Sequence, residues 1–201
     1  VNKVMATLNY LWKNRAKFPI GSNQFIRAWA KRIVSLPELL RKNRRRRVLI
    51  RKGALISKTA EIGEIEIGGP KKFFKVGSFS FIGKVNISLH HELHIGNNVC
   101  INDGVEILTA SHDVEDPLWQ HVKARVTIED YVWIGTGALI LPGVTLGHGC
   151  VIGARAVIAK SVAPGQIVVG NPGKPVSKKR SKNLNYNPCE FLVPNRAWLV
   201  G

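Results

Sequence analysis

Acidic side chains are scarce in this sequence, which has 13 Asp and Glu against 30 Lys and Arg and a formal net charge of +17. The surplus lies at the two ends of the chain. Residues 1–53 carry a net +14 and residues 171–201 carry +5, whereas residues 54–170 carry −2. Because the middle of the chain is nearly neutral, the charge distribution argues against a uniformly basic nucleic-acid-binding domain.

Cysteines are also few, and long apolar runs are missing. The three cysteines, Cys100, Cys150 and Cys189, form no CxxC pair, which argues against a disulfide framework and is typical of a reducing compartment. No apolar run approaches the roughly 18–20 residues of a membrane span, and the N-terminal stretch lacks the apolar core of a signal peptide. We therefore expect a cytoplasmic protein with one domain and terminal extensions.

The strongest pattern in the chain is a six-residue repeat. One set of large aliphatic residues recurs every six positions without a gap: Ile128, Ile134, Ile140, Leu146, Ile152 and Ile158. A set of small or β-branched residues follows each of these by four positions: Val132, Ala138, Val144, Cys150, Ala156 and Val162. Glycine follows three of the aliphatic residues directly.

This period predicts short strands joined by tight corners. A helix would repeat every 3.6 residues and a hairpin sheet would alternate every two, so neither explains a period of six. We expect each large aliphatic to point inward and stack on its counterpart one coil away. The same frame appears at Ile95, Ile101 and Ile107, is weaker at residues 62–83, and slips between residues 83 and 95.

The frame breaks from Ser111 to Arg125, in a polar excursion that contains His112, Trp119 and His121. Segments that leave a regular scaffold are common places for functional sites. The excursion is therefore the first place to look for an active site.

The two ends of the chain lack the repeat. Phe25, Trp29 and Ile33 lie at helical spacing, and Pro37 is expected to end that pattern. A basic run follows from Arg41 to Lys52. We divide the chain into a basic, partly helical region (1–53), a β-helix domain with a loop excursion at 111–125 (54–170), and a basic tail with little pattern (171–201).

Several short phrases beyond the repeat are typical of one family. They are Ser111-His112-Asp113, residues 131–135, Leu141-Pro142-Gly143-Val144, Gly153-Ala154, Lys160 and Gly170-Asn171-Pro172. With the repeat, they resemble the hexapeptide-repeat acetyltransferases over about residues 54–178. These include maltose and galactoside O-acetyltransferases and, more closely, the colanic acid and O-antigen polysaccharide O-acetyltransferases.

The resemblance implies a left-handed parallel β-helix, acetyl-CoA as co-substrate with no permanently bound cofactor or metal, and a homotrimer with active sites between neighbouring chains. It implies His112 as the catalytic base and Asn86 as the candidate that holds the sugar acceptor. For the acyl donor, it implies the following residues: Trp133, Thr136, Ala154, Lys160 and Lys174. The predicted activity is O-acetylation of a sugar hydroxyl, with a cell-surface polysaccharide or its lipid-linked precursor as acceptor.

A neutral imidazole suits this chemistry, because its ordinary pKa of about 6.5 lets it take a proton from a hydroxyl near neutral pH. Asp113, Glu115 or Glu106 are candidates to orient the His112 ring by accepting its other N–H. Direct transfer needs no covalent intermediate.

Alternatives stay open at this point. The enzyme could be an N-acetyltransferase of an amino sugar or a xenobiotic acetyltransferase, or the chain could be a non-catalytic, membrane-associated β-helix scaffold. A metal site at His90, His91 and His94 is a weaker hypothesis, since strand geometry turns neighbouring side chains apart. The basic run could contact anionic lipid at the inner face of the membrane, an anionic polysaccharide, or solvent alone.

Overall fold

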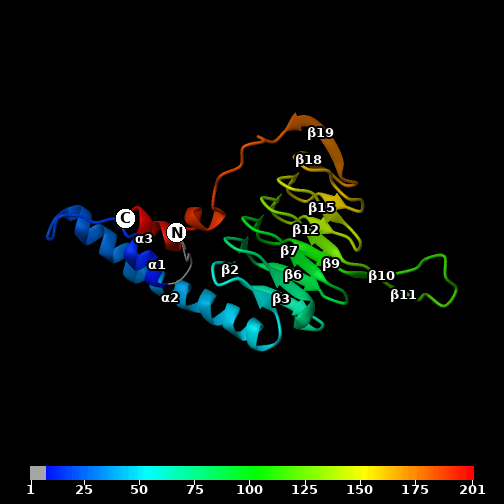
Figure 1. The fold of residues 1–201 in the computed structure, drawn as a ribbon, viewed down its shortest axis with the longest axis horizontal. Helices are drawn as coiled ribbons and strands as arrows, with labels where there is room; N and C mark the ends of the chain where they lie inside the picture. The colour runs from blue at the N-terminus through cyan, green and yellow to red at the C-terminus, as the bar shows by residue number, and fades with distance from the viewer. Residues whose placement is uncertain (1–7) are drawn as a thin grey trace.

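The computed structural model of the protein describes residues 8–201. Its main body is a left-handed parallel β-helix whose coils each contribute a short strand to three sheets (Figure 1). The first sheet contains β1 (Leu55–Ile56), β4 (Phe74–Val76), β7 (Leu93–Ile95), β12 (Val126–Ile128) and β15 (Thr145–Leu146). The predicted fold class is confirmed.

The second sheet is the longest of the three. In chain order it contains β2 (Glu61–Ile62), β5 (Phe81–Ile82), β8 (Cys100–Ile101), β13 (Trp133–Ile134), β16 (Val151–Ile152), β18 (Gln166–Val169) and the antiparallel β19 (Lys174–Lys179). The third sheet contains β3 (Ile65–Gly68), β6 (Val85–Ser88), β9 (Glu106–Leu108), β14 (Leu139–Ile140) and β17 (Val157–Ile158). A short 3-10 helix, η1 (Lys71–Phe73), precedes β4.

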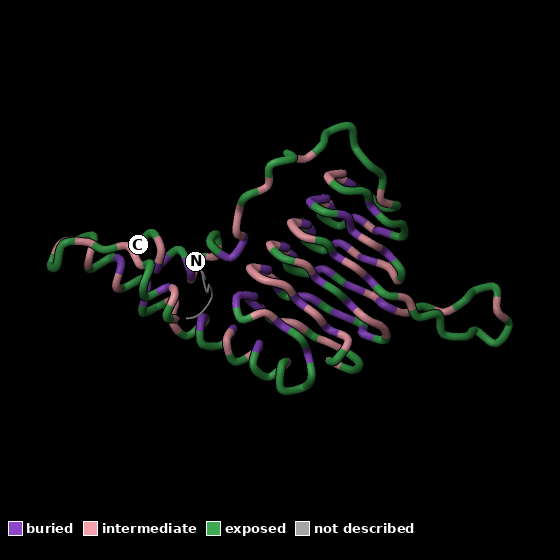
Figure 2. Tube along the Cα trace, viewed as in Figure 1, coloured by how far each residue is buried: buried purple, intermediate pink, exposed green. Residues whose placement is uncertain are grey.

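The large aliphatic residues of the repeat stack in columns inside the solenoid. Ile134 lies in register with Ile152, and Ile140 with Ile158, three hexads apart. Their side chains are buried, as are the small residues at the corners such as Ala138. Figure 2 shows the buried positions on the inward faces of successive coils. Burial of each such aliphatic stabilises the fold by about 1.5–3 kcal/mol before chain entropy is counted.

The glycines that follow the aliphatic residues are required by the next coil. A Cβ on Gly135 would lie 2.7 Å from the backbone nitrogen of Ala154, and a Cβ on Gly147 would lie 2.7 Å from the backbone nitrogen of Pro164. Backbone atoms cannot move aside as the end of a flexible side chain can. The glycine of the repeat therefore reflects the close approach of two corners.

The slip between residues 83 and 95 has a structural cause. Between Ile128 and Ile158 paired residues lie 18 positions apart, but Ile62 pairs with Ile82 and Phe81 with Cys100, so the first two coils are longer than 18 residues. In the second coil the extra length lies at the corner after β6, where Thr109 Oγ1 accepts hydrogen bonds from the backbone N–H groups of His90 and His91.

A helical unit stands at the first coil. It contains α1 (Leu8–Lys13), α2 (Asn23–Arg51), the 3-10 helix η2 (Pro188–Phe191) and α3 (Val193–Leu199). In Figure 1, α3 lies beside α1 and α2, and the end of α2 runs along the first coil. Of the helices formed by residues 8–201, none combines the length and the apolar character that a membrane crossing needs.

The expectation that Pro37 ends the helix was wrong. Ser22 caps α2 at its start by accepting a hydrogen bond from the Phe25 N–H at 3.1 Å, and the helix continues through Pro37 to Arg51. Proline inside a helix costs about 3 kcal/mol. Here α2 contacts α3 on both sides of the proline, through Ser35 and Leu39, and the first coil after it, through Lys42, so these tertiary contacts offset that cost.

The C-terminal tail, whose sequence shows little pattern, forms β19, η2 and α3. After β19 the chain returns along the solenoid to the helical unit, as Figure 1 shows. Arg180 donates to the carbonyl of Tyr131 at 2.8 Å and to the hydroxyl of Tyr186, and Asn98 donates to the Tyr186 carbonyl at 2.9 Å. At the end of this path Asn195 donates to the buried carboxylate of Glu61, which also binds Lys42 Nζ at 3.1 Å.

Candidate active site

Where the hexads stop, the chain forms an antiparallel hairpin that projects from the solenoid (Figure 1). Its strands are β10 (Ala110–His112) and β11 (His121–Lys123), and His112 pairs with His121. The loop between them is held by Asp116, whose carboxylate accepts hydrogen bonds from the backbone N–H groups of Leu118 and Gln120. The hairpin thus gives the segment a defined shape.

His112 is fixed in this hairpin by Trp119. The His112 Nδ1 lies 2.8 Å from the backbone carbonyl oxygen of Trp119, and the two rings stack with centroids 3.7 Å apart. A carbonyl oxygen can only accept, so Nδ1 carries the hydrogen of the neutral ring and Nε2 keeps its lone pair. That tautomer presents a base at Nε2.

The proposal that a carboxylate orients His112 was wrong. The Asp113 carboxylate instead accepts a hydrogen bond from the backbone N–H of Glu115 at 3.0 Å. The partner of His112 is a backbone carbonyl, whose position depends on the turn at Trp119, where φ is +48°.

Two further histidines form a row with His112, in which His121 lies between His112 and His90. The ring centroids of His112 and His121 are 4.6 Å apart, and those of His121 and His90 are 5.1 Å apart. Desolvation lowers the pKa of His121, and the nearby charges of His112, His90 and Lys123 lower it further. Across residues 8–201, no three or more His, Cys, Asp or Glu side chains are arranged to hold a metal ion.

Asn86 lies on β6, in the same sheet as β9, from which the hairpin leaves. Its side chain is exposed on the outer face of that sheet, in register with Glu66 on β3 and Glu106 on β9. Asn86 is therefore on the sheet next to the hairpin, and its assignment to the acceptor stays a prediction.

Trp133 is 44% exposed on the second sheet. It lines an open groove of about 600 Å³ with Cys100, Arg180, Tyr186 and Phe191. The returning C-terminal segment therefore forms one wall of this groove. Burial raises the pKa of the Cys100 thiol to about 11, so the thiol stays protonated and contributes an apolar surface.

The other predicted donor-binding residues lie at two edges of the prism. Thr136 and Ala154 are exposed at stacked corners between the second and third sheets, where Arg155 N–H donates to the Thr136 carbonyl at 2.9 Å. Lys160 is exposed at the corner that follows the third sheet, which is also the edge from which the hairpin leaves. Lys174 is exposed on β19, opposite Val169.

One chain therefore does not bring all of these residues together. His112 and Lys160 share one edge, whereas Thr136 and Ala154 occupy another, with the third sheet between them. Trp119, which holds His112, and His121, which lies beside it, were not predicted as site residues. Both were visible as members of the polar excursion, but no spacing rule links a histidine to a carbonyl seven residues later.

The chain matches the family model for the bacterial transferase hexapeptide (six repeats) over residues 125–160. It is 29% identical to the galactoside O-acetyltransferase of Escherichia coli K12 over 144 residues. The aligned part covers 67% of this chain and 71% of that protein. It is 55% identical over 51 residues to a chloramphenicol acetyltransferase of Escherichia coli, which covers 25% of this chain and 24% of that protein. The chain spans about half of the length, or less, of several curated relatives that it matches.

Among solved structures, the fold resembles that of the hexapeptide-repeat acetyltransferase VCA0836 from Vibrio cholerae, solved with acetyl coenzyme A. The TM-score is 0.64 with 24% identity, over 87% of this chain and 98% of that one. A maltose O-acetyltransferase from Clostridium difficile 630 gives a TM-score of 0.63 with 23% identity, over 90% of this chain and 100% of that one. Because both identities are below 25%, the structural similarity shows a shared fold alone.

Proposed function

Because the chain is a hexapeptide-repeat protein whose relatives in sequence include acetyltransferases, we propose that it transfers an acetyl group from acetyl-CoA to a sugar hydroxyl. The observation that carries this proposal is the contact between His112 Nδ1 and the Trp119 carbonyl, which leaves Nε2 free to act as a base. The acceptor would be a cell-surface polysaccharide or its lipid-linked precursor.

In the proposed reaction, the acceptor hydroxyl gives its proton to His112 Nε2 as its oxygen attacks the thioester carbonyl. The C–S bond then breaks, and the same proton passes from Nε2 to the departing thiolate of CoA. General-base catalysis of this kind contributes roughly 10²–10⁴-fold to the rate. The stacked Trp119 ring would keep the imidazole in the orientation that serves both steps.

The donor would lie along the corners that carry Thr136 and Ala154, where its pantetheine arm can bond to backbone groups. Lys160 and Lys174 would sit near the CoA phosphates, and Trp133 would pack beside the donor groove. Since these corners and His112 lie on different edges of one prism, a neighbouring chain that brings the two edges together would complete the site. This geometry supports a homotrimer.

The helical unit supports a place at the inner face of a membrane. Ile26, Ile33 and Val34 on α2 are 59%, 66% and 81% exposed, and Arg27 and Lys31 lie between them in the sequence. A basic helix with exposed apolar side chains can lie on anionic lipid. An enzyme that acts on a lipid-linked glycan would gain from that position.

The test is release of free CoA from acetyl-CoA, measured with a thiol reagent, in the presence of a panel of acceptors. The panel contains galactosides, maltose, an amino sugar and chloramphenicol. Acceptor-dependent release with a hydroxyl sugar is the expected result. Turnover of chloramphenicol or of the amine alone would favour the second candidate, a xenobiotic or N-acetyltransferase, which the match to chloramphenicol acetyltransferase supports. No release with any acceptor, together with no binding of CoA, would favour a non-catalytic scaffold.

A further inference from the structure

The basic run of α2 is divided by helical periodicity into three faces. Lys42 and Arg46 point at the first coil and are buried. Lys42 forms an ion pair with Glu61, and Arg46 donates to the carbonyl oxygen of Ala60 at 3.1 Å. Arg47 and Arg51 are exposed and are not among the residues that line the two grooves beside this part of α2. The remaining basic residues, Arg41, Arg44, Arg45 and Lys52, recur three, four and eleven positions apart and so share one face.

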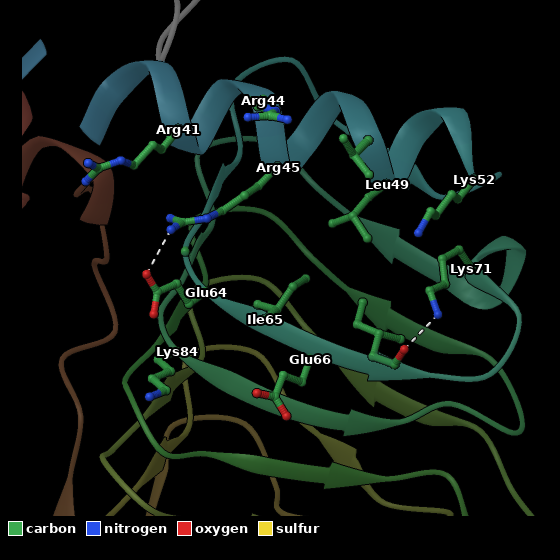
Figure 3. Close-up of a pocket in the computed structure, with 13 residues that line it drawn as sticks. Arg41, Arg44, Arg45, Leu49, Lys52, Glu64, Ile65, Glu66, Lys71 and Lys84 are labelled. Carbon is green, nitrogen blue, oxygen red and sulfur yellow. Dashed lines mark hydrogen bonds and ion pairs between the residues drawn. The ribbon is translucent and has the colours of Figure 1, made fainter. Parts of the chain in front are cut away.

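That third face forms one wall of a groove of about 640 Å³. The opposite wall is β3 and the corner that precedes β6. Figure 3 shows the groove between α2 and β3, with Lys71 and Lys84 contributing from the solenoid side. A concave site of this size accommodates a small molecule or the head group of a larger one.

The groove carries an excess of positive charge. Six basic side chains line it, against the carboxylates of Glu64 and Glu66. Arg45 is paired with Glu64 at 2.9 Å, and Lys71 donates to the carbonyl oxygens of Ile67 and Gly69. Within residues 8–201, the side chains of Arg44, Lys52 and Lys84 make no hydrogen bond or ion pair. Three cations thus line one small groove without a partner.

The floor of the groove adds backbone donors, because β3 is the last strand of its sheet. In a parallel pair, alternate residues direct both their N–H and C=O groups to the same side. The carbonyls of Glu64 and Gly68 accept from β6 and from Leu89, so the groups of Ile65 and Ile67 face the other way. Lys71 reaching the Ile67 carbonyl at 2.7 Å agrees with that direction.

The groove also has apolar surface. Val48 and Leu49 of α2 face Ile65 and Ile67 of β3 across it. A ligand that suits the whole groove therefore joins an anionic part to an apolar or sugar part. The cations are distributed along the groove, with Lys52 and Lys84 at different ends of it (Figure 3). Arg and backbone N–H groups are well matched to phosphate oxygens, so the free N–H groups of the edge strand together with a nearby cation suit a phosphate or pyrophosphate ester.

We propose that the groove between α2 and β3, which Arg44, Lys52 and Lys84 line, is a binding site for a phosphate or pyrophosphate ester. This site lies apart from the hairpin of His112 and does not depend on the proposed acetyl transfer. The same chemistry is offered by a soluble phosphorylated compound and by the head group of a phospholipid.

The experiment uses the full chain and two probes. Inorganic pyrophosphate is titrated into the protein by calorimetry, and vesicles of phosphatidylcholine with phosphatidic acid are tested by co-sedimentation. The test variant is Arg44→Gln/Lys84→Gln, and the matched control is Arg47→Gln/Arg51→Gln, which removes the same charge from the exposed face of the same helix. Circular dichroism checks that both variants fold.

The expected result is binding of at least one probe, weakened at least tenfold in the test variant and less than twofold in the control. Binding of pyrophosphate identifies a soluble ester as sufficient, and binding of the vesicles alone identifies the lipid head group as the source. If binding were weakened equally in both variants, it would depend on the general surface charge and not on the groove, and the proposal would be overturned. The absence of binding to both probes would overturn it as well.

Discussion

Replacing Gly135 with Ala tests the stacking of the coils at a single methyl group. The added Cβ would lie 2.7 Å from the backbone nitrogen of Ala154 and 3.0 Å from the Ile152 carbonyl oxygen. The Gly135 N–H also donates to that carbonyl at 2.8 Å. To make room for the methyl group, the two coils must move apart. That movement lengthens or breaks this hydrogen bond.

The magnitude follows from two terms. Overpacking against groups that cannot move costs about 1–3 kcal/mol, and the loss of one backbone hydrogen bond costs about 0.5–1.5 kcal/mol. We expect Gly135→Ala to lower the free energy of unfolding by roughly 2–4 kcal/mol. In a chain of this size that is a fall in Tm of roughly 5–15 °C.

Gly68→Ala is the matched control, since a Cβ there has one neighbour within 4 Å, the Ile87 carbonyl oxygen at 3.9 Å. Its stability should stay within about 0.5 kcal/mol of wild type or rise slightly through reduced chain entropy. Urea unfolding followed by circular dichroism measures both variants. If Gly135→Ala unfolds at the same urea concentration as Gly68→Ala, the close approach of the corners is not the reason that the repeat requires a glycine.

Three further predictions concern the helical unit, the hairpin and the thiols. Lys42→Met should cost about 3–5 kcal/mol in urea unfolding because it leaves the Glu61 carboxylate buried without its cation. The double variant Lys42→Met/Glu61→Leu should regain only part of that loss, because the buried Asn195 amide also loses its acceptor on Glu61; no regain at all would refute the assignment. Trp119→Ala should lower kcat of acetyl transfer about tenfold by freeing the His112 ring, with little change in CoA binding; an unchanged kcat would refute the role. Burial raises the pKa of Cys150 to about 12, so its reactive thiolate is nearly absent at pH 8 and the native protein should resist thiol reagents at that pH. Rapid native labelling at Cys150, as fast as in denaturant, would contradict its burial.

The solenoid could be predicted from the sequence because its information is local. A period of six with one large and one small apolar residue per unit has few other solutions, and Ile134 and Ala138 lie where that pattern predicts them. The repeated glycines were visible too, although their reason, the contact between Gly135 and the next coil, needed the distance between corners.

The ends could not be predicted in the same way. A proline rule ends the helix at Pro37, but contacts of α2 with α3 and with the first coil come from residues far away in the sequence. Once the helix continues to Arg51, its periodicity separates Lys42 from Arg44, which the sequence presents as one basic run. The buried pair of Lys42 and Glu61 depends on that continuation.

The candidate site could be predicted in part. His112 stood out because it lies in a polar excursion and in a phrase typical of the family. Its partner could not be found, since a carboxylate can be seen in a sequence but the carbonyl of Trp119 acquires its role only through the turn of the hairpin. Likewise, the separation of His112 from Thr136 and Ala154 appears only when the corners are placed in space.

The most direct test of the account is the rate of acetyl transfer by His112→Ala beside wild type and His94→Ala, at saturating acetyl-CoA and with the best acceptor of the panel. His94 is an exposed histidine on β7, a strand that does not belong to the hairpin, and controls for the loss of an imidazole. The account predicts a fall of at least a hundredfold for His112→Ala, as expected when a general base is removed, and less than twofold for His94→Ala. Equal rates in wild type and His112→Ala would remove His112 from the chemistry and contradict the account.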